Sequence, residues 1–275
     1  MSKLKIATTG LNGLVGSRIN ELLANDFDFI NLNQEIMDIT NIEIVNKIIK
    51  DTDFDLFLHL AAYTNVDGAE KNRELAWNIN VKGTKNIFQV ITEKNKKMIY
   101  ISTDFVYDGI HSPFDENSSP NPKTYYGETK YQGELVVKDN AMIIRFSYPY
   151  RTAFNNKTDL VRSIINILAN KQKINGVIDQ IITPTYIDDI AFGLKYLINN
   201  YTTEIFHLVG SESLSGYNLI QKICHYFKLK NNLVGKINYD QFYQGRAKRP
   251  KNGTIISAQN NFQPMKNLDE GLLKF

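Results

Sequence analysis

A turn with three glycines, set between a short apolar segment and a helical pattern, constrains the fold of this chain more than any other feature. Residues 3–9 have the composition of a buried strand, and residues 14–23 place apolar side chains at three- and four-residue steps. Gly10, Gly13 and Gly16 lie in the connection between them. A strand, a glycine turn and a helix begin an open α/β sheet, and the N–H groups at such a helix start bind phosphate. The alternative is a glycine turn without a ligand.

The three glycines have different expected purposes. Gly10 allows a tight turn, Gly13 lets the backbone approach a pyrophosphate, and Gly16 lets the helix pack close to the sheet. We therefore expect the whole turn to contact a dinucleotide through Gly10, Asn12, Gly13, Leu14 and Val15.

The second expected strand, residues 27–32, ends without the signals that distinguish one dinucleotide from another. Asn33 and Gln34 stand where an acid would bind the adenosine ribose or a basic residue a 2′-phosphate. Asp38, with Ile39 beside it, could accept a hydrogen bond from the adenine amino group. Asp38 could equally start the next helix near Thr40, and both roles are compatible.

The third expected strand, residues 55–60, ends in small residues. Ala61 and Ala62, followed by Tyr63, would let a flat ligand lie against the backbone. Asn80 falls in a helical stretch over residues 70–94. Its amide either faces inward and anchors the backbone near the site, or faces solvent.

A second group of polar residues follows the strand expected over residues 97–102. Ser102 and Thr103 come at its carboxyl end, the edge at which parallel sheets bind ligands. Tyr126 and Lys130 are four residues apart, so on a helix they share one face. A nearby ammonium lowers the pKa of a phenol, which lets tyrosine exchange a proton near neutral pH. Such a pair by itself is typical of a solvated helix face.

These motifs occur together in one known family. The chain resembles the extended short-chain dehydrogenases/reductases, and within them the dTDP-4-dehydrorhamnose reductases. The first half of the resemblance consists of Gly10, Gly13, Gly16, Asp38–Thr40, Leu60–Thr64, Val66, Asp67, Asn80, Gly83, Thr84, Ser102–Asp104, Tyr107–Gly109, Pro122, Tyr126 and Lys130. The second half consists of Asp179, Gln180, Pro184, Thr185, Asp188–Ala191, Ala247–Pro250 and Asn252.

The resemblance implies reduction of the C4 ketone of a 4-keto-6-deoxy sugar on a nucleotide diphosphate, with NADPH or NADH. Tyr126 would donate the proton, Lys130 would hold the nicotinamide ribose, and Thr103 would polarise the carbonyl. The remaining implied contacts are Ala61, Ala62, Tyr63, Asn80 and Ser102 for the cofactor, and Asp104, Phe105, Tyr148 and Arg249 for the substrate. Related enzymes also suggest a homodimer.

Tyr148 and Phe105 bear on the substrate and on rival functions, respectively. Tyr148 stands where these reductases usually carry tryptophan against the sugar. Phe105 follows Asp104, whereas a nucleotide-sugar dehydratase commonly has an Asp-Glu pair there. The missing carboxylate argues against dehydration and leaves an epimerase with bound NAD open. A silent NADP-binding subunit, like that of methionine adenosyltransferase, is a further alternative that the intact Thr103, Tyr126 and Lys130 make less favoured.

The fold implied is a Rossmann-type doubly wound parallel sheet with a smaller α/β substrate-binding lobe. Strands and helices alternate as far as residue 147. We expect residues 1–147 and about 181–210 to form the dinucleotide-binding domain, and about 148–180 and 211–275 to form the lobe. The later expected elements are helices over 160–169, 187–198 and 217–227 and strands over 174–178 and 204–209.

Composition argues against several other classes of protein and site. The net charge of +3 over 275 residues, without an arginine-rich stripe, does not indicate nucleic acid. No run approaches eighteen apolar residues and no signal peptide is indicated, so we expect a cytoplasmic protein outside the membrane. Cys224 is the only cysteine, and the four histidines lack metal-ligand spacing, so neither a disulfide nor a zinc site is expected. The basic group around Arg249 is either a diphosphate contact or a solvated loop.

Overall fold

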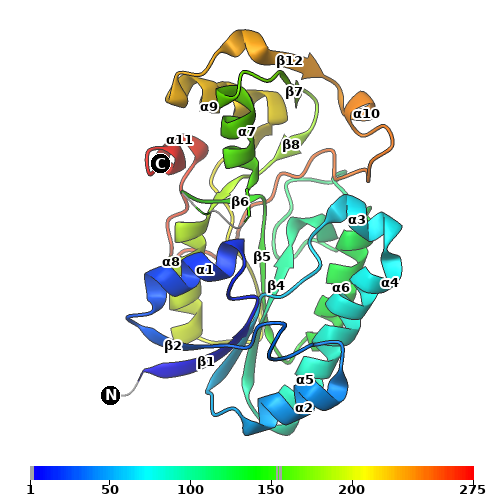
Figure 1. Ribbon diagram of the computed structural model, residues 1–275, viewed down its shortest axis with the longest axis vertical. Coiled ribbons are helices and arrows are strands. Elements are labelled where there is room, and N and C mark those ends of the chain that lie inside the picture. The colour runs from blue at the N-terminus through cyan, green and yellow to red at the C-terminus, as the bar shows by residue number, and fades with distance from the viewer. Residues whose placement is uncertain (1–2, 153, 155–156) are drawn as a thin grey trace.

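The computed structural model describes residues 3–152, 154 and 157–275. Its centre is one parallel sheet of six strands in the order β10-β5-β4-β3-β1-β2 (Figure 1). These strands are β1 (Leu4–Thr9), β2 (Phe27–Asn31), β3 (Leu56–His59), β4 (Lys97–Thr103), β5 (Met142–Phe146) and β10 (Ile205–His207). The sequence prediction of a doubly wound parallel sheet is confirmed, including the late strand that returns to the sheet beside β5.

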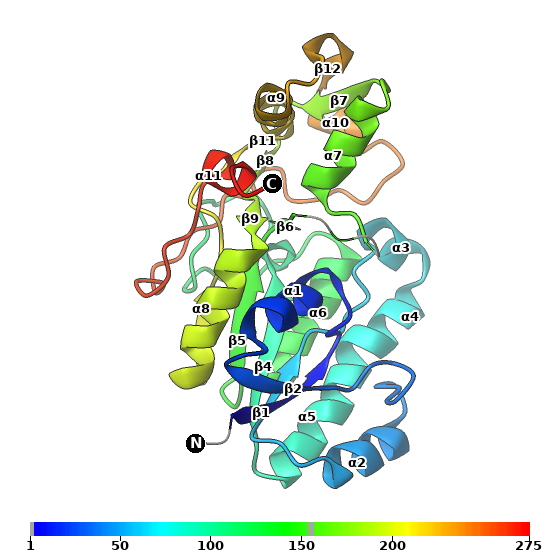
Figure 2. The same cartoon turned by 60° about the vertical axis from the view of Figure 1, so that its left-hand side comes forward.

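Helices cover both faces of this sheet (Figures 1 and 2). On one face lie α1 (Leu14–Leu23) and α8 (Ile187–Asn199), and on the other lie α2 (Ile42–Asp51), α5 (Thr84–Glu93) and α6 (Tyr125–Val137). Successive side chains of a strand point to opposite faces. In β1, Ile6 accordingly enters the core beneath α1 and α8, while its neighbour Ala7 enters the core beneath α2 and α5.

The helical stretch expected over residues 70–94 is divided. It comprises the end of α3 (Val66–Lys71), α4 (Arg73–Trp77), the π-helical segment η1 (Asn78–Gly83) and then α5. A π-helical segment inserts an extra residue per turn and is often found beside functional sites. Here it contains Asn80, whose side chain is directed into the protein.

A smaller lobe lies beyond the carboxyl ends of the sheet strands and has its own apolar core (Figure 1). Its helices are α7 (Leu160–Ala169), α9 (Gly216–Phe227), α10 (Tyr239–Phe242) and α11 (Leu268–Leu272). Its short strand pairs are β7 (Ile174–Val177) with β12 (Val234–Ile237) and β8 (Ile181–Ile182) with β11 (Leu214–Ser215), while β6 (Pro149–Tyr150) and β9 (Thr185–Tyr186) pair at its base. This separate core supports a division into two domains, which remains a proposal. The boundary expected at about residue 181 differs from the structure, because β8 pairs with β11 and Ile182 packs in the core of the lobe.

Two of the histidines and Cys224 are part of the packed interior, as expected. Burial lowers the pKa of His59 to about 3 and that of His207 to about 4, so both are neutral core side chains. Cys224 is buried in α9. Among the described residues, none of the helices has the length and apolarity needed to cross a bilayer.

Candidate active site

A cleft of about 1340 Å³ lies at the carboxyl ends of the strands, between the sheet and the lobe. Pockets for a single small ligand measure about 300–1,000 Å³, so this cleft has room for a cofactor and a substrate together. Most of the residues predicted from the sequence line it, namely Gly10, Asn12, Gly13, Leu14, Val15, Asp38, Ile39, Ala61, Ala62, Ser102, Thr103, Asp104, Phe105, Tyr126, Lys130, Tyr148 and Arg249.

The glycine turn forms the end of the cleft next to α1. Gly13 is the N-cap of α1 and provides no side-chain acceptor for the first N–H groups of the helix. Gly10 has φ of +74°, and a Cβ there would lie 2.7 Å from the Ala61 nitrogen. At Gly16 a Cβ would lie 2.5 Å from the Gly10 oxygen. Gly16 therefore allows the helix to pack closely against the turn, and its expected effect on packing against the sheet stays a prediction. This cradle of backbone N–H groups fits a pyrophosphate.

The side of the cleft after β2 is built from short polar side chains. Asn31 Nδ2 donates to Asn12 Oδ1 at 2.9 Å, and Asn33 Oδ1 accepts from Ile36 N at 3.0 Å. Asp38 Oδ1 accepts from both the backbone N and the hydroxyl of Thr40, at 2.9 and 2.8 Å. The N-cap of α2 is Asn41 rather than Asp38, so Asp38 shapes the turn before the helix while lining the cleft.

Asn80 and Tyr63, which were expected to contact the cofactor, are outside the cleft lining in the described structure. The Asn80 amide accepts from Tyr63 N at 2.8 Å and donates to Tyr63 O at 3.2 Å. It also donates to Thr129 Oγ1 on α6 at 2.9 Å. Asn80 therefore faces inward and ties the segment after β3 to the helix that carries Tyr126.

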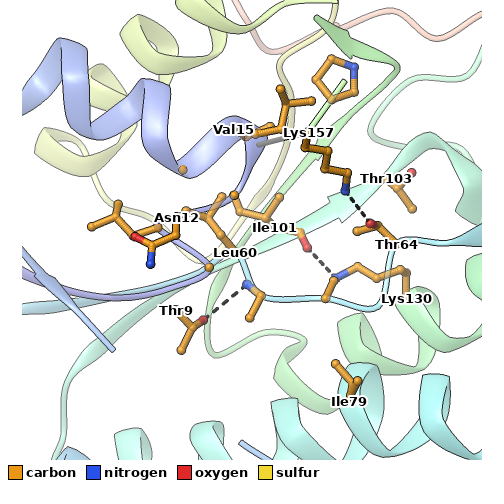
Figure 3. A pocket seen from close by; sticks show the side chains of 18 of the residues that line it. Thr9, Asn12, Val15, Leu60, Thr64, Ile79, Ile101, Thr103, Lys130 and Lys157 are labelled. Carbon is orange, nitrogen blue, oxygen red and sulfur yellow. Dashed lines mark hydrogen bonds between the residues drawn. The ribbon is translucent and has the colours of Figure 1, made fainter. Parts of the chain in front are cut away.

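Thr103, Tyr126 and Lys130 converge on one wall of the cleft, and each is less than 10 % exposed. Thr103 is the last residue of β4, whereas Tyr126 and Lys130 belong to α6. Thr124 caps α6 by accepting from Gly127 N at 3.0 Å. The Lys130 ammonium donates to the Ile101 carbonyl at 2.7 Å (Figure 3). It also lies 4.1 Å from the centre of the Tyr100 ring.

Burial has the largest effect on the pKa values of Lys130 and Tyr126. It lowers the pKa of Lys130 to about 7, against an opposing effect of Glu134. It raises the pKa of Tyr126 above the ordinary value, and hydrogen bonding to Thr103 opposes that rise. The Tyr126 pKa is thus not lowered by Lys130 as expected: burial raises it, and the group that opposes the rise is Thr103 rather than Lys130.

Asp104, Phe105 and Tyr148 continue the same wall. The Phe105 ring lies 5.6 Å from that of Tyr126 and 6.0 Å from that of Tyr148. Tyr148 has φ of 39°, in the left-handed region that a bulky residue rarely adopts. Backbone strain of this kind concentrates at functional sites.

Comparison with known proteins agrees with this geometry. The family model for the RmlD substrate binding domain matches residues 4–267. The chain belongs to the RmlD family. It is 28% identical over 272 residues to dTDP-4-dehydrorhamnose reductase of Aggregatibacter actinomycetemcomitans, covering 91% of this chain and 90% of that protein. It is 31% identical over 237 residues to the probable low-salt glycan biosynthesis reductase Agl14 of Haloferax volcanii, covering 78% of each.

A solved structure is similar over the whole chain. It is dTDP-4-dehydrorhamnose reductase of Bacillus anthracis str. Ames in complex with NADP, with a TM-score of 0.91 and 32% identity. The match covers 100% of this chain and 99% of that one.

This RmlD family member also has two cross-cleft contacts between the lobe and the nucleotide side. Arg249 Nη2 lies 3.1 Å from Asp67 Oδ2, and Lys157 Nζ donates to Thr64 Oγ1 at 3.0 Å (Figure 3). Lys157 lines the cleft and was not predicted, since it lies in an irregular segment without a motif. Within the described residues, no three potential metal ligands gather in one place.

Proposed function

We propose that this RmlD family protein reduces the C4 ketone of a nucleotide-diphosphate 4-keto-6-deoxy sugar, using NADPH or NADH. The observation that carries the proposal is the convergence of Thr103, Tyr126 and Lys130 on a cleft whose other end is the glycine turn of α1. The relative from Aggregatibacter actinomycetemcomitans and the similar solved structure are dTDP-4-dehydrorhamnose reductases, and that structure holds NADP.

In this proposal a bound nicotinamide cofactor supplies the hydride. Tyr126 donates its proton to the alkoxide oxygen that develops at C4, and Thr103 hydrogen-bonds the same oxygen. Lys130 holds the nicotinamide ribose. Its ammonium donates to the carbonyl of Ile101, which lines the same cleft.

The other lining residues divide between the two ligands. Gly10, Asn12, Gly13, Leu14 and Val15 would surround the cofactor phosphates. The adenine would contact Asp38 and Ile39, and the nicotinamide half would contact Ala61, Ala62 and Ser102. Asp104, Phe105, Tyr148 and Arg249 would contact the sugar nucleotide, with the guanidinium of Arg249 suited to its diphosphate. Tyr63 and Asn80 would support the cofactor site indirectly.

The rival functions fit this site less well. Dehydration needs a second carboxylate beside Asp104, and Phe105 packs there against Tyr126 instead. A catalytically silent NADP-binding subunit would not require Thr103, Tyr126 and Lys130 to converge on the cleft. The sugar nucleotide is the proposed partner, nucleic acid is not expected, and a homodimer is proposed from related enzymes.

The test is a screen of NADPH and NADH consumption with 4-keto-6-deoxy sugars on dTDP, GDP and UDP. The proposal predicts oxidation of added cofactor and a C4 alcohol product with at least one of them. Tightly bound NAD in the purified protein, with isomerised sugar and no net oxidation, would instead indicate an epimerase. Co-purification of a partner enzyme without any turnover would indicate a binding subunit.

A further inference from the structure

Asp67 links the nucleotide side of the cleft to the lobe and has no role in the proposed reaction. It lies in the first turn of α3 and is outside the cleft lining in the described structure. Its Oδ1 accepts from Ala247 N at 2.9 Å, and its Oδ2 accepts from Arg249 Nη2 at 3.1 Å. A single carboxylate on α3 therefore holds both the backbone and an arginine side chain of the lobe segment after α10.

The lobe supports Arg249 from its own side. The Arg249 carbonyl accepts from the Tyr239 hydroxyl at 2.5 Å, and the guanidinium carbon lies 5.2 Å from the centre of the Tyr243 ring. Tyr243 in turn donates to Gln180 Oε1 at 2.9 Å, and Gln180 Nε2 donates to Pro250 O at 3.0 Å. These contacts fix the backbone at Arg249 and place an aromatic ring against its guanidinium.

The guanidinium held in this way still has donors for a ligand. Arg249 lines the cleft, and its side chain is 20% exposed. A guanidinium carries five N–H donors in a rigid fork. Within the described residues, its hydrogen-bond partners are Asp67 and, at 3.4 Å, the Ala247 carbonyl. The remaining donors suit the oxygens of a diphosphate.

We propose that Asp67 is a positioning residue that orients Arg249 for the diphosphate of the sugar nucleotide. This inference rests on the proposed function, which assigns Arg249 to that diphosphate. A mobile arginine side chain loses rotamer freedom when it binds a ligand, and this loss weakens binding. The Asp67 contact restricts Arg249 before the ligand arrives, so less freedom is lost on binding.

The charge of Asp67 acts in the opposite direction, because an anion beside the site repels a diphosphate. The Asp67 side chain is 42% exposed, so water and salt screen this repulsion. The oriented N–H donors of Arg249 act at contact distance, where charge-assisted hydrogen bonds are strong. The net effect of Asp67 is therefore tighter binding, and the opposite sign is measurable.

The test measures, by calorimetry, the binding of dTDP, UDP and GDP to the wild type and to Asp67→Asn. The amide of an asparagine offers one acceptor oxygen, so it cannot hold Ala247 N and Arg249 together. We expect the diphosphate that binds the wild type most tightly to bind Asp67→Asn about threefold to tenfold more weakly. With the keto-sugar substrate, KM should rise by the same factor while kcat stays within about twofold.

A double variant separates positioning from a general loss of structure. Because Asp67 acts through Arg249, Asp67→Asn should weaken binding little further once Arg249→Ala is present. Additive losses in the double variant would contradict the positioning role. Asp67→Ala removes both contacts and should weaken binding at least as much as Asp67→Asn does.

Asp240→Asn is the matched control, because it removes the same charge from α10, close to Arg249 in sequence. Asp240 is 77% exposed, lies 3.7 Å from Lys248 and is outside the cleft lining in the described part of the chain. Its diphosphate affinity should equal that of the wild type. Urea unfolding of all variants establishes that the fold is retained.

The possible failures are distinguishable. An active wild type whose diphosphate affinity is unchanged or increased in Asp67→Asn overturns the positioning role and leaves the proposed function intact. Diphosphate binding that depends on Asp67 as expected, in a protein that reduces no keto-sugar nucleotide, overturns the proposed reaction alone. A wild type that neither binds these diphosphates nor reduces any keto-sugar nucleotide overturns both.

Discussion

Arg145 on β5 and Glu134 on α6 form a two-pronged ion pair in which both side chains are almost completely buried. Arg145 Nε and Nη2 donate to the two Glu134 oxygens at 2.8 and 2.5 Å. Arg145 Nη1 donates to the Tyr107 hydroxyl at 2.7 Å, which contacts His207 on β10 at 3.0 Å. Because Glu134 lies one helical turn beyond Lys130, this network fixes α6, which carries Tyr126 and Lys130, against two strands of the sheet.

Replacing Glu134 with Ala should destabilise the protein strongly. The change leaves a buried guanidinium unpaired, which typically costs about 3–5 kcal/mol of unfolding free energy. Asp26→Ala is the control, because its pair with Lys195 is partly exposed and should matter by at most about 1 kcal/mol. Urea unfolding of the two variants measures the difference, and equal losses would contradict this account of the network.

Replacing Tyr126 with Phe should remove the proposed proton donor without disturbing its packing. We expect kcat for ketone reduction to fall by about 10²–10⁴-fold. Tyr125→Phe is the matched control, since Tyr125 lies outside the cleft lining in the described structure and should keep near-normal turnover. Near-full activity in Tyr126→Phe would exclude this tyrosine as the donor.

Replacing Lys130 with Met should change how stability depends on pH. The folded protein lowers the Lys130 pKa to about 7, so between that pH and the ordinary lysine value the unfolded chain binds more protons. Stability contributed through Lys130 therefore increases as pH rises above about 7. Urea unfolding of the ligand-free proteins at neutral and alkaline pH should show the wild type gaining stability relative to Lys130→Met. A relative gain in wild-type stability as the pH is lowered would contradict the predicted direction.

Replacing Gly10 with Ala should damage both the turn and cofactor binding. Gly10 has φ of +74°, and the new Cβ would lie 2.7 Å from Ala61 N. Gly245→Ala is the control that separates backbone strain from steric overlap. Gly245 has the same φ of +74°, but a Cβ there would have no atom within 4 Å. Backbone strain alone costs roughly 1–2 kcal/mol, so Gly10→Ala should exceed that loss and also weaken NADPH binding measured by fluorescence.

Replacing Arg249 with Ala should weaken substrate binding more than it slows the chemical step. A hydrogen bond to a charged group contributes about 1.5–3 kcal/mol, which corresponds to roughly 10–100-fold in KM. Lys248→Ala is the control, since its side chain is 68% exposed and paired with Asp240. A KM that is unchanged in Arg249→Ala would place the diphosphate elsewhere in the cleft.

Local sequence patterns predicted the sheet, most helices and the lining of the cleft. The alternation of side chains in β1, the glycines before α1 and the four-residue spacing of Tyr126 and Lys130 each depend on neighbours in the chain. Such short-range rules fix which face or turn a residue occupies. They therefore indicated the family and the candidate site without any coordinates.

The tertiary structure alone decided which residues meet across the cleft and how they titrate. Asn80 reaches Thr129, Asp67 reaches Arg249 and Lys157 reaches Thr64 across long stretches of chain, and no local pattern specifies such pairs. The low pKa of Lys130 and the raised pKa of Tyr126 likewise arise from desolvation by segments that arrive from all directions. Removal of water depends on the complete packing around a group, and for that reason spacing along the chain could identify these residues but not their protonation.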